Sequence, residues 1–283
     1  MTDSFGARLT KVVAERGPLC VGIDPHPGLL TDWGLTADAA GLERFALGAV
    51  EAVAGEVAVV KPQSAFFETY GAAGIAVLER VIAESSAAGA LVLLDVKRGD
   101  IGSTMAAYAR AYLADGAPLA ADAVTVSPYL GFGSLDPALE LAAATGRGVF
   151  ALSLTSNPEG AAVQRATTRD GGTVGRSVVD AAAERNSGAT PMGSIGVVIG
   201  ATVGRLEMDI SRLNGPVLAP GFGAQGGTVA DILATFGSTG RGLAAPVLPS
   251  SSRDVLRHGP DQRLLRDAAI RLRDVVAIEL SWP

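Results

Sequence analysis

The stretch ALVLLDVKRGDIGST, residues 90–104, passes from an apolar run through a group of charges into the start of a helical pattern. Its first five residues are apolar without a break, which is typical of a strand buried on both faces, as in a parallel sheet. Asp95, Lys97 and Asp100 follow, and residues 103–115 have helical spacing. The stretch therefore predicts a strand–loop–helix unit with its charges at the C-terminal end of the strand.

Seven further apolar runs of this kind occur along the chain, at 19–23, 57–60, 123–126, 148–152, 195–199, 216–219 and 244–248. Helical patterns separate many of them, at 36–54, 70–88, 134–145 and 174–187, and another follows the last run, at 254–277. Eight such units predict an α/β protein, a single (β/α)₈ barrel domain over residues 1–283. An open doubly wound sheet is the alternative, although eight units exceed its usual strand count.

Composition and charge exclude several classes of protein. The 283 residues include 23 Lys and Arg against 29 Asp and Glu, and the net charge of −6 argues against nucleic acid as a partner. The apolar runs are too short to cross a bilayer, and the N-terminus has no signal-peptide pattern. The single cysteine, Cys20, leaves no internal disulfide. We therefore expect a cytoplasmic protein that binds neither nucleic acid nor membranes.

Lysine is rare in this chain, and two of its three copies end apolar runs. They are Lys61 and Lys97, while Lys11 lies near the N-terminus. Asp95 and Lys97 are two residues apart on a strand, so both side chains should point to the barrel mouth, together with that of Lys61. Carboxylates at Asp95 and Asp100 would keep Lys97 protonated, as a fixed cation and proton donor rather than a nucleophile.

A purely structural role is the alternative for this cluster. Asp100 or Ser103 would then cap the helix that follows, and Asp95 and Lys97 would form an ion pair that only supports the fold. Buried charges at a barrel mouth are costly to desolvate and hard to justify by stability, which favours a catalytic role for the set.

Two loops near the C-terminus are suited to a phosphate group. Residues 219–228, APGFGAQGGT, contain four glycines, which let a backbone approach an anion closely. Residues 249–254, PSSSRD, contribute Arg253, whose guanidinium suits bidentate phosphate recognition. Barrels commonly bind phosphate with the loops after their seventh and eighth strands. Ordinary turns are the alternative explanation of the glycines.

The segment DVKRGDIGST, residues 95–104, resembles the Asp-x-Lys-x-x-Asp-Ile-x-x-Thr signature of the orotidine 5′-phosphate decarboxylase family. Related metal-dependent sugar-phosphate barrels share the shorter Asp-x-Lys-x-x-Asp, but they place a glutamate where this chain has Lys61. Asp24 in VGIDP matches the family's first-strand aspartate. The resemblance covers essentially the whole chain, and PYLGFGSLDP and LTSNPEG are similar to its longer bacterial subgroup, type 2.

The resemblance implies decarboxylation of orotidine 5′-phosphate to uridine 5′-phosphate and CO₂, the last step of de novo pyrimidine nucleotide synthesis, without a metal or an organic cofactor. Lys97 would donate a proton to the substrate carbon, and the catalytic set would be Lys61, Asp95, Lys97 and Asp100. The other substrate-binding positions that it implies are Asp24 and Lys61 for the ribose, Ser156 for the pyrimidine, with Ser153 and Thr155 as nearby alternatives, and Pro220, Gln225 and Arg253 for the phosphate.

The resemblance also implies a homodimer with shared active sites. Asp100, Ile101 and Thr104 would reach into the partner's site. Two other functions stay open at this point: a metal-dependent sugar-phosphate lyase or aldolase of the same barrel superfamily, and a barrel that binds a nucleotide without turnover.

Overall fold

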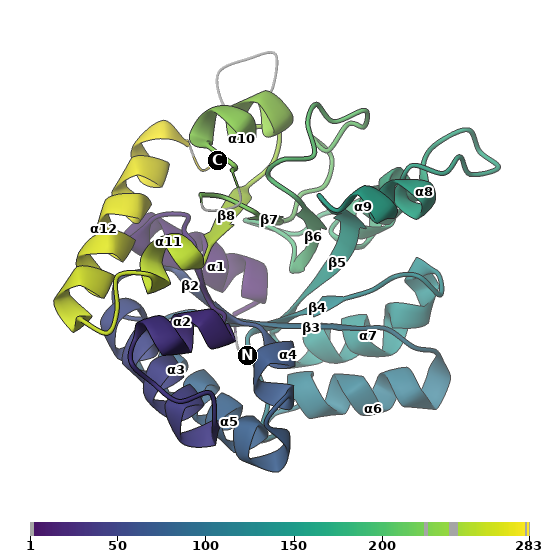
Figure 1. The fold of residues 1–283 in the computed structure, drawn as a ribbon. Helices are drawn as coiled ribbons and strands as arrows, with labels where there is room; N and C mark the ends of the chain where they lie inside the picture. Colours follow the sequence, from purple (N-terminus) through teal and green to yellow (C-terminus); the bar gives the residue numbers. More distant parts are fainter. Residues whose placement is uncertain (1–2, 224–225, 238–242, 281, 283) are drawn as a thin grey trace.

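The computed structural model describes residues 3–223, 226–237, 243–280 and 282. Eight parallel strands close into a barrel in chain order (Figure 1). The barrel closes because β8 pairs with β1, for example through Ser250 and Cys20. The strands are β1 (Cys20–Ile23), β2 (Val59–Pro62), β3 (Leu91–Arg98), β4 (Ala123–Val126), β5 (Gly148–Leu154), β6 (Ile195–Ile199), β7 (Val217–Pro220) and β8 (Val247–Ser251). The predicted barrel is therefore confirmed, and the open sheet is excluded.

Helices surround the barrel (Figure 1). Several begin where a polar side chain accepts a backbone N–H of the first turn, as Asp38 does from Gly41 at 2.8 Å. None of the described helices is long and apolar enough to cross a membrane. The helices are α1 (Phe5–Arg16), α2 (Pro27–Asp32), α3 (Ala39–Val53), α4 (Ser64–Glu68), α5 (Gly71–Ala87), α6 (Gly102–Leu113), α7 (Asp136–Thr145), α8 (Ala161–Gln164), α9 (Val174–Arg185), α10 (Val229–Phe236), α11 (Arg253–Leu256) and α12 (Gln262–Glu279), with short 3₁₀ turns at Phe132–Leu135 and Pro158–Gly160.

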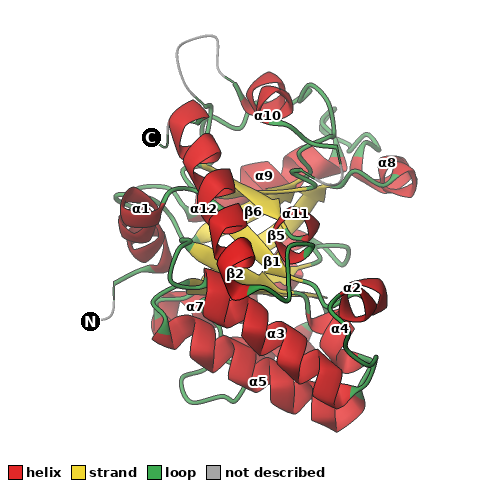
Figure 2. Cartoon of the chain, turned by 60° about the vertical axis from the view of Figure 1, so that its left-hand side comes forward, coloured by secondary structure: helices red, strands yellow, loops and turns green. Residues whose placement is uncertain are grey.

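Helix α1 closes the N-terminal end of the barrel (Figure 2). Phe5, Leu9 and Val13 repeat every four residues, so they form one apolar face, and they join the buried side chains of the barrel interior in one cluster. Phe5 packs edge-on against Phe150 of β5, with ring centroids 5.9 Å apart. Gly148 makes this contact possible, because a Cβ there would lie 2.4 Å from the Phe5 ring. A cavity can therefore open at the C-terminal ends of the strands.

Two predicted elements near the C-terminus were wrong in their bounds. The helix expected over 254–277 is two helices, α11 and α12. Pro260 has no backbone N–H to continue α11, and Gly259 packs so closely on Trp33 that a Cβ would lie 2.0 Å from its ring. The strand expected over 244–248 is displaced to Val247–Ser251, so Ser250 and Ser251 are strand residues. The apolar run misplaced this strand because its final serines are polar but buried.

Candidate active site

A cavity of about 210 Å³ opens at the C-terminal mouth of the barrel. Each of the eight strands, or the loop that follows it, contributes to its wall. The lining residues are Asp24, His26, Lys61, Gln63, Asp95, Lys97, Thr125, Leu152, Leu154, Thr155, Ser156, Val198, Gly200, Leu218, Pro220, Gly221, Phe222, Ser250, Ser252 and Arg253. Polar residues from the ends of several predicted strands thus come together at one site, as expected for a barrel.

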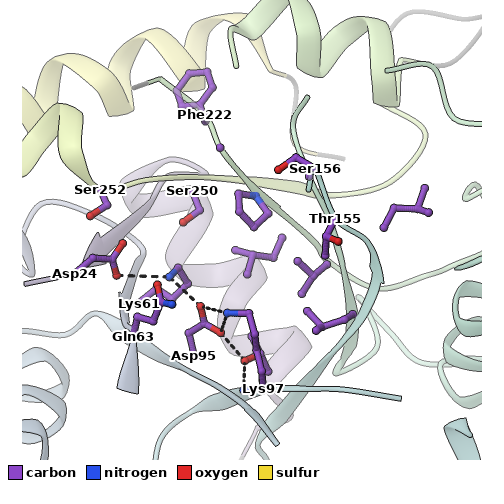
Figure 3. A pocket seen from close by; sticks show the side chains of 18 of the residues that line it. Asp24, Lys61, Gln63, Asp95, Lys97, Thr155, Ser156, Phe222, Ser250 and Ser252 are labelled. Atoms are coloured by element: carbon purple, nitrogen blue, oxygen red, sulfur yellow. Dashed lines mark hydrogen bonds and ion pairs between the residues drawn. The ribbon is translucent and has the colours of Figure 1, made fainter. Parts of the chain in front are cut away.

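Four side chains of alternating charge form a row along one side of this cavity (Figure 3). Asp24 follows β1, and its Oδ1 lies 3.9 Å from Lys61 Nζ on β2. The same Nζ lies 3.3 Å from Asp95 Oδ2 on β3. Lys97 Nζ donates to both carboxylate oxygens of Asp95, at 2.6 and 2.7 Å. The row therefore runs from Asp24 through Lys61 and Asp95 to Lys97.

Lys61 and Asp95, the two inner residues of the row, stay charged although they are buried. Burial opposes the charged form of Lys61, but the carboxylates of Asp24 and Asp95 outweigh it and raise the pKa of this ammonium above its ordinary value. Burial likewise opposes ionisation of Asp95. The two lysines, helped by hydrogen bonds from Lys97 and Thr125, outweigh it and lower the pKa of Asp95 to about 2. Lys97 ends the row with its side chain 45% exposed, so its ammonium is open to the cavity and solvent.

Within this chain, only one of the two carboxylates predicted beside Lys97 lies next to it. Among the described residues, Lys97 pairs with Asp95 alone, and it is Asp95 that lies between two lysines. Asp100 is absent from the cavity wall, and its Oδ1 accepts the N–H of Ile101 at 2.8 Å. Asp100 belongs to the short loop between β3 and α6 rather than to the strand that carries Asp95 and Lys97. Neither Asp100 nor Ser103 caps α6, whose N-cap is Ile101.

The other residues predicted to serve a partner subunit also lie outside the cavity. Ile101 is 62% exposed, and Thr104, in the first turn of α6, is exposed as well. Ile101 and Thr104 are therefore exposed near the start of α6, and Asp100, which precedes them, is half-buried.

Ser156 lies across the cavity from the charged row (Figure 3). The hydroxyls of Ser153 and Thr155, the two predicted alternatives to Ser156, form hydrogen bonds with other groups of the chain. Ser153 is buried, and its hydroxyl donates to Gly175 O at 2.8 Å. The Thr155 hydroxyl donates to Asn157 Oδ1 at 2.6 Å and accepts from Gln164 Nε2 at 2.7 Å. Gln164 Oε1 also accepts the Thr155 N–H at 2.8 Å, which steadies the backbone beside Ser156.

The loops after β7 and β8 meet at one end of the cavity. Pro220 and Arg253 both line it, whereas Gln225 lies outside the described residues. Gly223 has a φ of 84°, and a Cβ there would lie 1.7 Å from Asp254 Oδ2. Glycine is therefore required at 223, both for the left-handed backbone and for the close contact between the two loops.

The sequence patterns missed several lining residues. Thr125 lies within the apolar run AVTV, where one hydroxyl among buried side chains was the available signal. Ser250 of β8 and Ser252, which follows this strand, belong to the stretch PSSSRD, whose sequence cannot tell which of its serines face the cavity. His26 and Phe222 gave no pattern. Within the part of the chain that the structure describes, no three His, Cys, Asp or Glu side chains gather as they would around a metal ion.

Comparisons with known proteins agree on one family. The model of the orotidine 5′-phosphate decarboxylase / HUMPS family matches residues 17–261. The orotidine 5′-phosphate decarboxylase of Salinispora tropica is 63% identical over 270 residues, which is 95% of this chain and 96% of the relative. That of Streptomyces coelicolor is 58% identical over 269 residues, 95% of each chain.

The solved structures agree with this result. The crystal structure of a Streptomyces avermitilis protein assigned to the same activity is 56% identical, with a TM-score of 0.94 over 99% of this chain and 96% of the other. The structure of the Leishmania donovani OMP decarboxylase is 28% identical, with a TM-score of 0.71 over 97% of this chain and 99% of the other.

Proposed function

Because the chain belongs to the orotidine 5′-phosphate decarboxylase / HUMPS family, we propose that the cavity at its barrel mouth decarboxylates orotidine 5′-phosphate with Lys97 as proton donor. The protein is a carbon–carbon lyase of pyrimidine nucleotide synthesis that forms uridine 5′-phosphate and CO₂. The observation that carries the mechanism is the Lys97 ammonium at the open end of the charged row, 2.6 Å from Asp95.

The reaction asks the protein for a cation and a proton at one ring carbon. When the bond to the carboxylate breaks, CO₂ leaves and the bonding electrons stay on C6 of the pyrimidine, which has no attached electron sink. A fixed positive charge aimed at that carbon stabilises the developing carbanion. The Lys97 ammonium supplies this charge and then transfers its proton to C6. Solvent reprotonates the amine, which its exposed side chain permits.

The rest of the row positions this lysine and the sugar. Asp95 binds Lys97 through both carboxylate oxygens, and Lys61 holds Asp95 from the opposite side. Asp24 and Lys61 bind the ribose hydroxyls. Asp24 lines the cavity, and its Oδ1 accepts no hydrogen bond from the described residues, so this carboxylate has capacity left for a sugar hydroxyl. The row carries no net charge, which limits the cost of burying it.

The base and the phosphate are bound on other sides of the cavity. The exposed hydroxyl of Ser156 hydrogen-bonds the pyrimidine, while Ser153 and Thr155 serve the fold. Arg253 and Pro220 bind the phosphate, and Gln225 joins them. The binding energy of a phosphate far from the reacting carbon is used to orient the substrate for decarboxylation.

The two other functions are less well supported. A metal-dependent lyase of the superfamily would need a glutamate where Lys61 stands, and relatives at about 60% identity are named decarboxylases. A barrel that only binds a nucleotide has no need for Lys97 beside Asp95 at the open end of the cavity. The decarboxylase assignment accounts for the lysines and for the relatives together.

We propose a two-fold homodimer in which Asp100, Ile101 and Thr104 complete the partner's site. Ile101, Tyr129 and Leu130, in the loops after β3 and β4, are 62%, 78% and 51% exposed, and an exposed apolar group of this kind is typical of an interface. A carboxylate of the partner subunit would give Lys97 its second neighbour.

We further propose that residues 1–283 form one domain and that the protein is cytoplasmic. One cluster of buried side chains extends from Leu19 to Leu280, which supports the single domain. A cytoplasmic location suits an enzyme whose substrate and product are charged nucleotides.

Two alanine variants test whether Lys97 supplies the proton and Arg253 binds the phosphate. Lys97→Ala should lower kcat for decarboxylation by at least about 10³-fold. Uridine 5′-phosphate should still bind, because the phosphate contacts lie on other loops. Arg253→Ala should weaken uridine 5′-phosphate binding and lower kcat/KM more than kcat. Steady-state kinetics and calorimetric titration measure both effects. Near-normal kcat in Lys97→Ala would show that another group protonates the carbon.

A further inference from the structure

Strand β3 departs from regular geometry where it carries Lys97. Leu94 pairs with Val124 and Arg98 pairs with Val126, so β3 advances four residues where β4 advances two. Such a bulge takes the backbone N–H groups of its extra residues out of the regular ladder of sheet hydrogen bonds. Lys97 lies within the bulge and has a φ of 46°, in the left-handed region that residues with a side chain rarely adopt.

Thr125 of β4 supplies hydrogen bonds to this bulge. Its Oγ1 accepts the N–H of Val96 at 3.1 Å and the N–H of Lys97 at 3.0 Å, and it donates to Asp95 Oδ1 at 2.7 Å. A hydroxyl has one proton and two acceptor lone pairs, so these bonds use its full capacity. Thr125 is 1% exposed, so solvent water has little access to compete for them.

These three hydrogen bonds connect the strained backbone at Lys97 with the Asp95 carboxylate, and the proposed reaction depends on the positions of both. The two N–H bonds hold the strained backbone from which the Lys97 side chain returns to Asp95. The third bond fixes one oxygen of the Asp95 carboxylate, and Lys97 donates to that same oxygen at 2.6 Å. Removing the hydroxyl would leave two N–H groups unpaired and free both the bulge and the carboxylate to move. A displacement of about 1 Å at a reacting group can cost about 10²-fold in rate.

We propose that Thr125 is a positioning residue for decarboxylation, because one hydroxyl holds the β3 bulge and the Asp95 carboxylate together and thereby places the Lys97 ammonium. This inference rests on the proposed function. Arg253 is the first residue of α11, after β8, and Ser156 lies in the loop after β5, so neither belongs to the bulge. Thr125 should therefore affect turnover and leave nucleotide binding unchanged.

The test compares three variants in the full-length protein. Thr125→Val keeps the shape and removes the hydroxyl, and we expect kcat to fall by about 10²-fold, with the Kd of uridine 5′-phosphate within about twofold of wild type. Thr125→Ser keeps the hydroxyl and should retain kcat within about threefold. Thr235→Val, the same change at a buried threonine of α10, is the matched control and should leave kcat unchanged.

The outcomes separate the inference from the proposed function. An inactive wild-type protein in this assay would overturn the proposed function. An active wild type with normal kcat in Thr125→Val, or with Thr125→Ser as impaired as Thr125→Val, would overturn the role of the hydroxyl. Equal losses of kcat and binding would do the same, because they indicate a general structural defect. If Thr125→Val does not fold, Thr125→Cys, whose thiol is a weak hydrogen-bonding group, should show the same selective loss of kcat.

Discussion

Asp95 has the most constrained position in the site, because it lies between two ammonium groups and accepts a hydroxyl hydrogen bond. Burial alone would favour its neutral form, yet Lys61 and Lys97 lower its pKa from 3.8 to about 2. An ionised carboxylate at this position is what keeps two lysines close together in a buried cavity. The charged state of each group in the row therefore depends on the charges of its neighbours.

This dependence predicts how stability varies with pH. The folded-state pKa of Asp95 is below its unfolded value, so the ionised carboxylate contributes stability above pH 3.8, and this contribution is lost as the pH falls toward about 2. Wild type should therefore be more stable than Asp95→Asn at neutral pH, and the difference should shrink as the pH falls below 4. Urea unfolding at a series of pH values measures it. A difference that stays constant or widens on acidification would contradict the assigned ionisation.

At the scale of the elements, the sequence was sufficient for the number and order of the strands. Parallel strands buried on both faces leave apolar runs, and each of the eight runs corresponds to a strand. The same physics explains the errors in their bounds. β3 and β8 continue into polar residues, such as Arg98 and Ser250, because the backbone of a residue with a polar side chain still pairs with the neighbouring strand. A run of apolar letters ends before such a strand does.

The site was predictable to a similar extent. A spacing of two on one strand correctly placed Asp95 and Lys97 together at the mouth. The bulge in β3 left no trace in the sequence, because it depends on a hydroxyl from the neighbouring strand. The contacts of Asp100 could not be predicted from the sequence either, because packing, and not periodicity, sets the direction of a loop.

At the scale of the whole molecule, the proposed dimer makes a prediction about two copies of the chain. Lys97 has one carboxylate neighbour among the described residues, and Asp100 lies beside the exposed Ile101. Subunit exchange tests this arrangement. Lys97→Ala and Asp100→Ala should each be inactive, and in a mixed dimer one site receives both changes while the other receives neither.

The mixture should therefore recover activity. With equal amounts and random pairing, half of the dimers are mixed, so activity should rise to about a quarter of wild type. Native mass spectrometry establishes that exchange has occurred. If mixed dimers form and remain inactive, Asp100 acts within its own chain and the shared site is wrong, even though the decarboxylase assignment would stand.

The central claim is that fixed charges of the chain itself, rather than a metal ion, decarboxylate orotidine 5′-phosphate. The most direct measurement follows the conversion of orotidine 5′-phosphate to uridine 5′-phosphate spectrophotometrically, before and after exhaustive treatment of the wild-type protein with EDTA. We expect turnover at the same rate in both samples, since Lys61 occupies the position at which metal-dependent relatives have a glutamate. Activity that disappears with EDTA and returns with Mg²⁺, or tight binding of uridine 5′-phosphate without any turnover, would contradict this account.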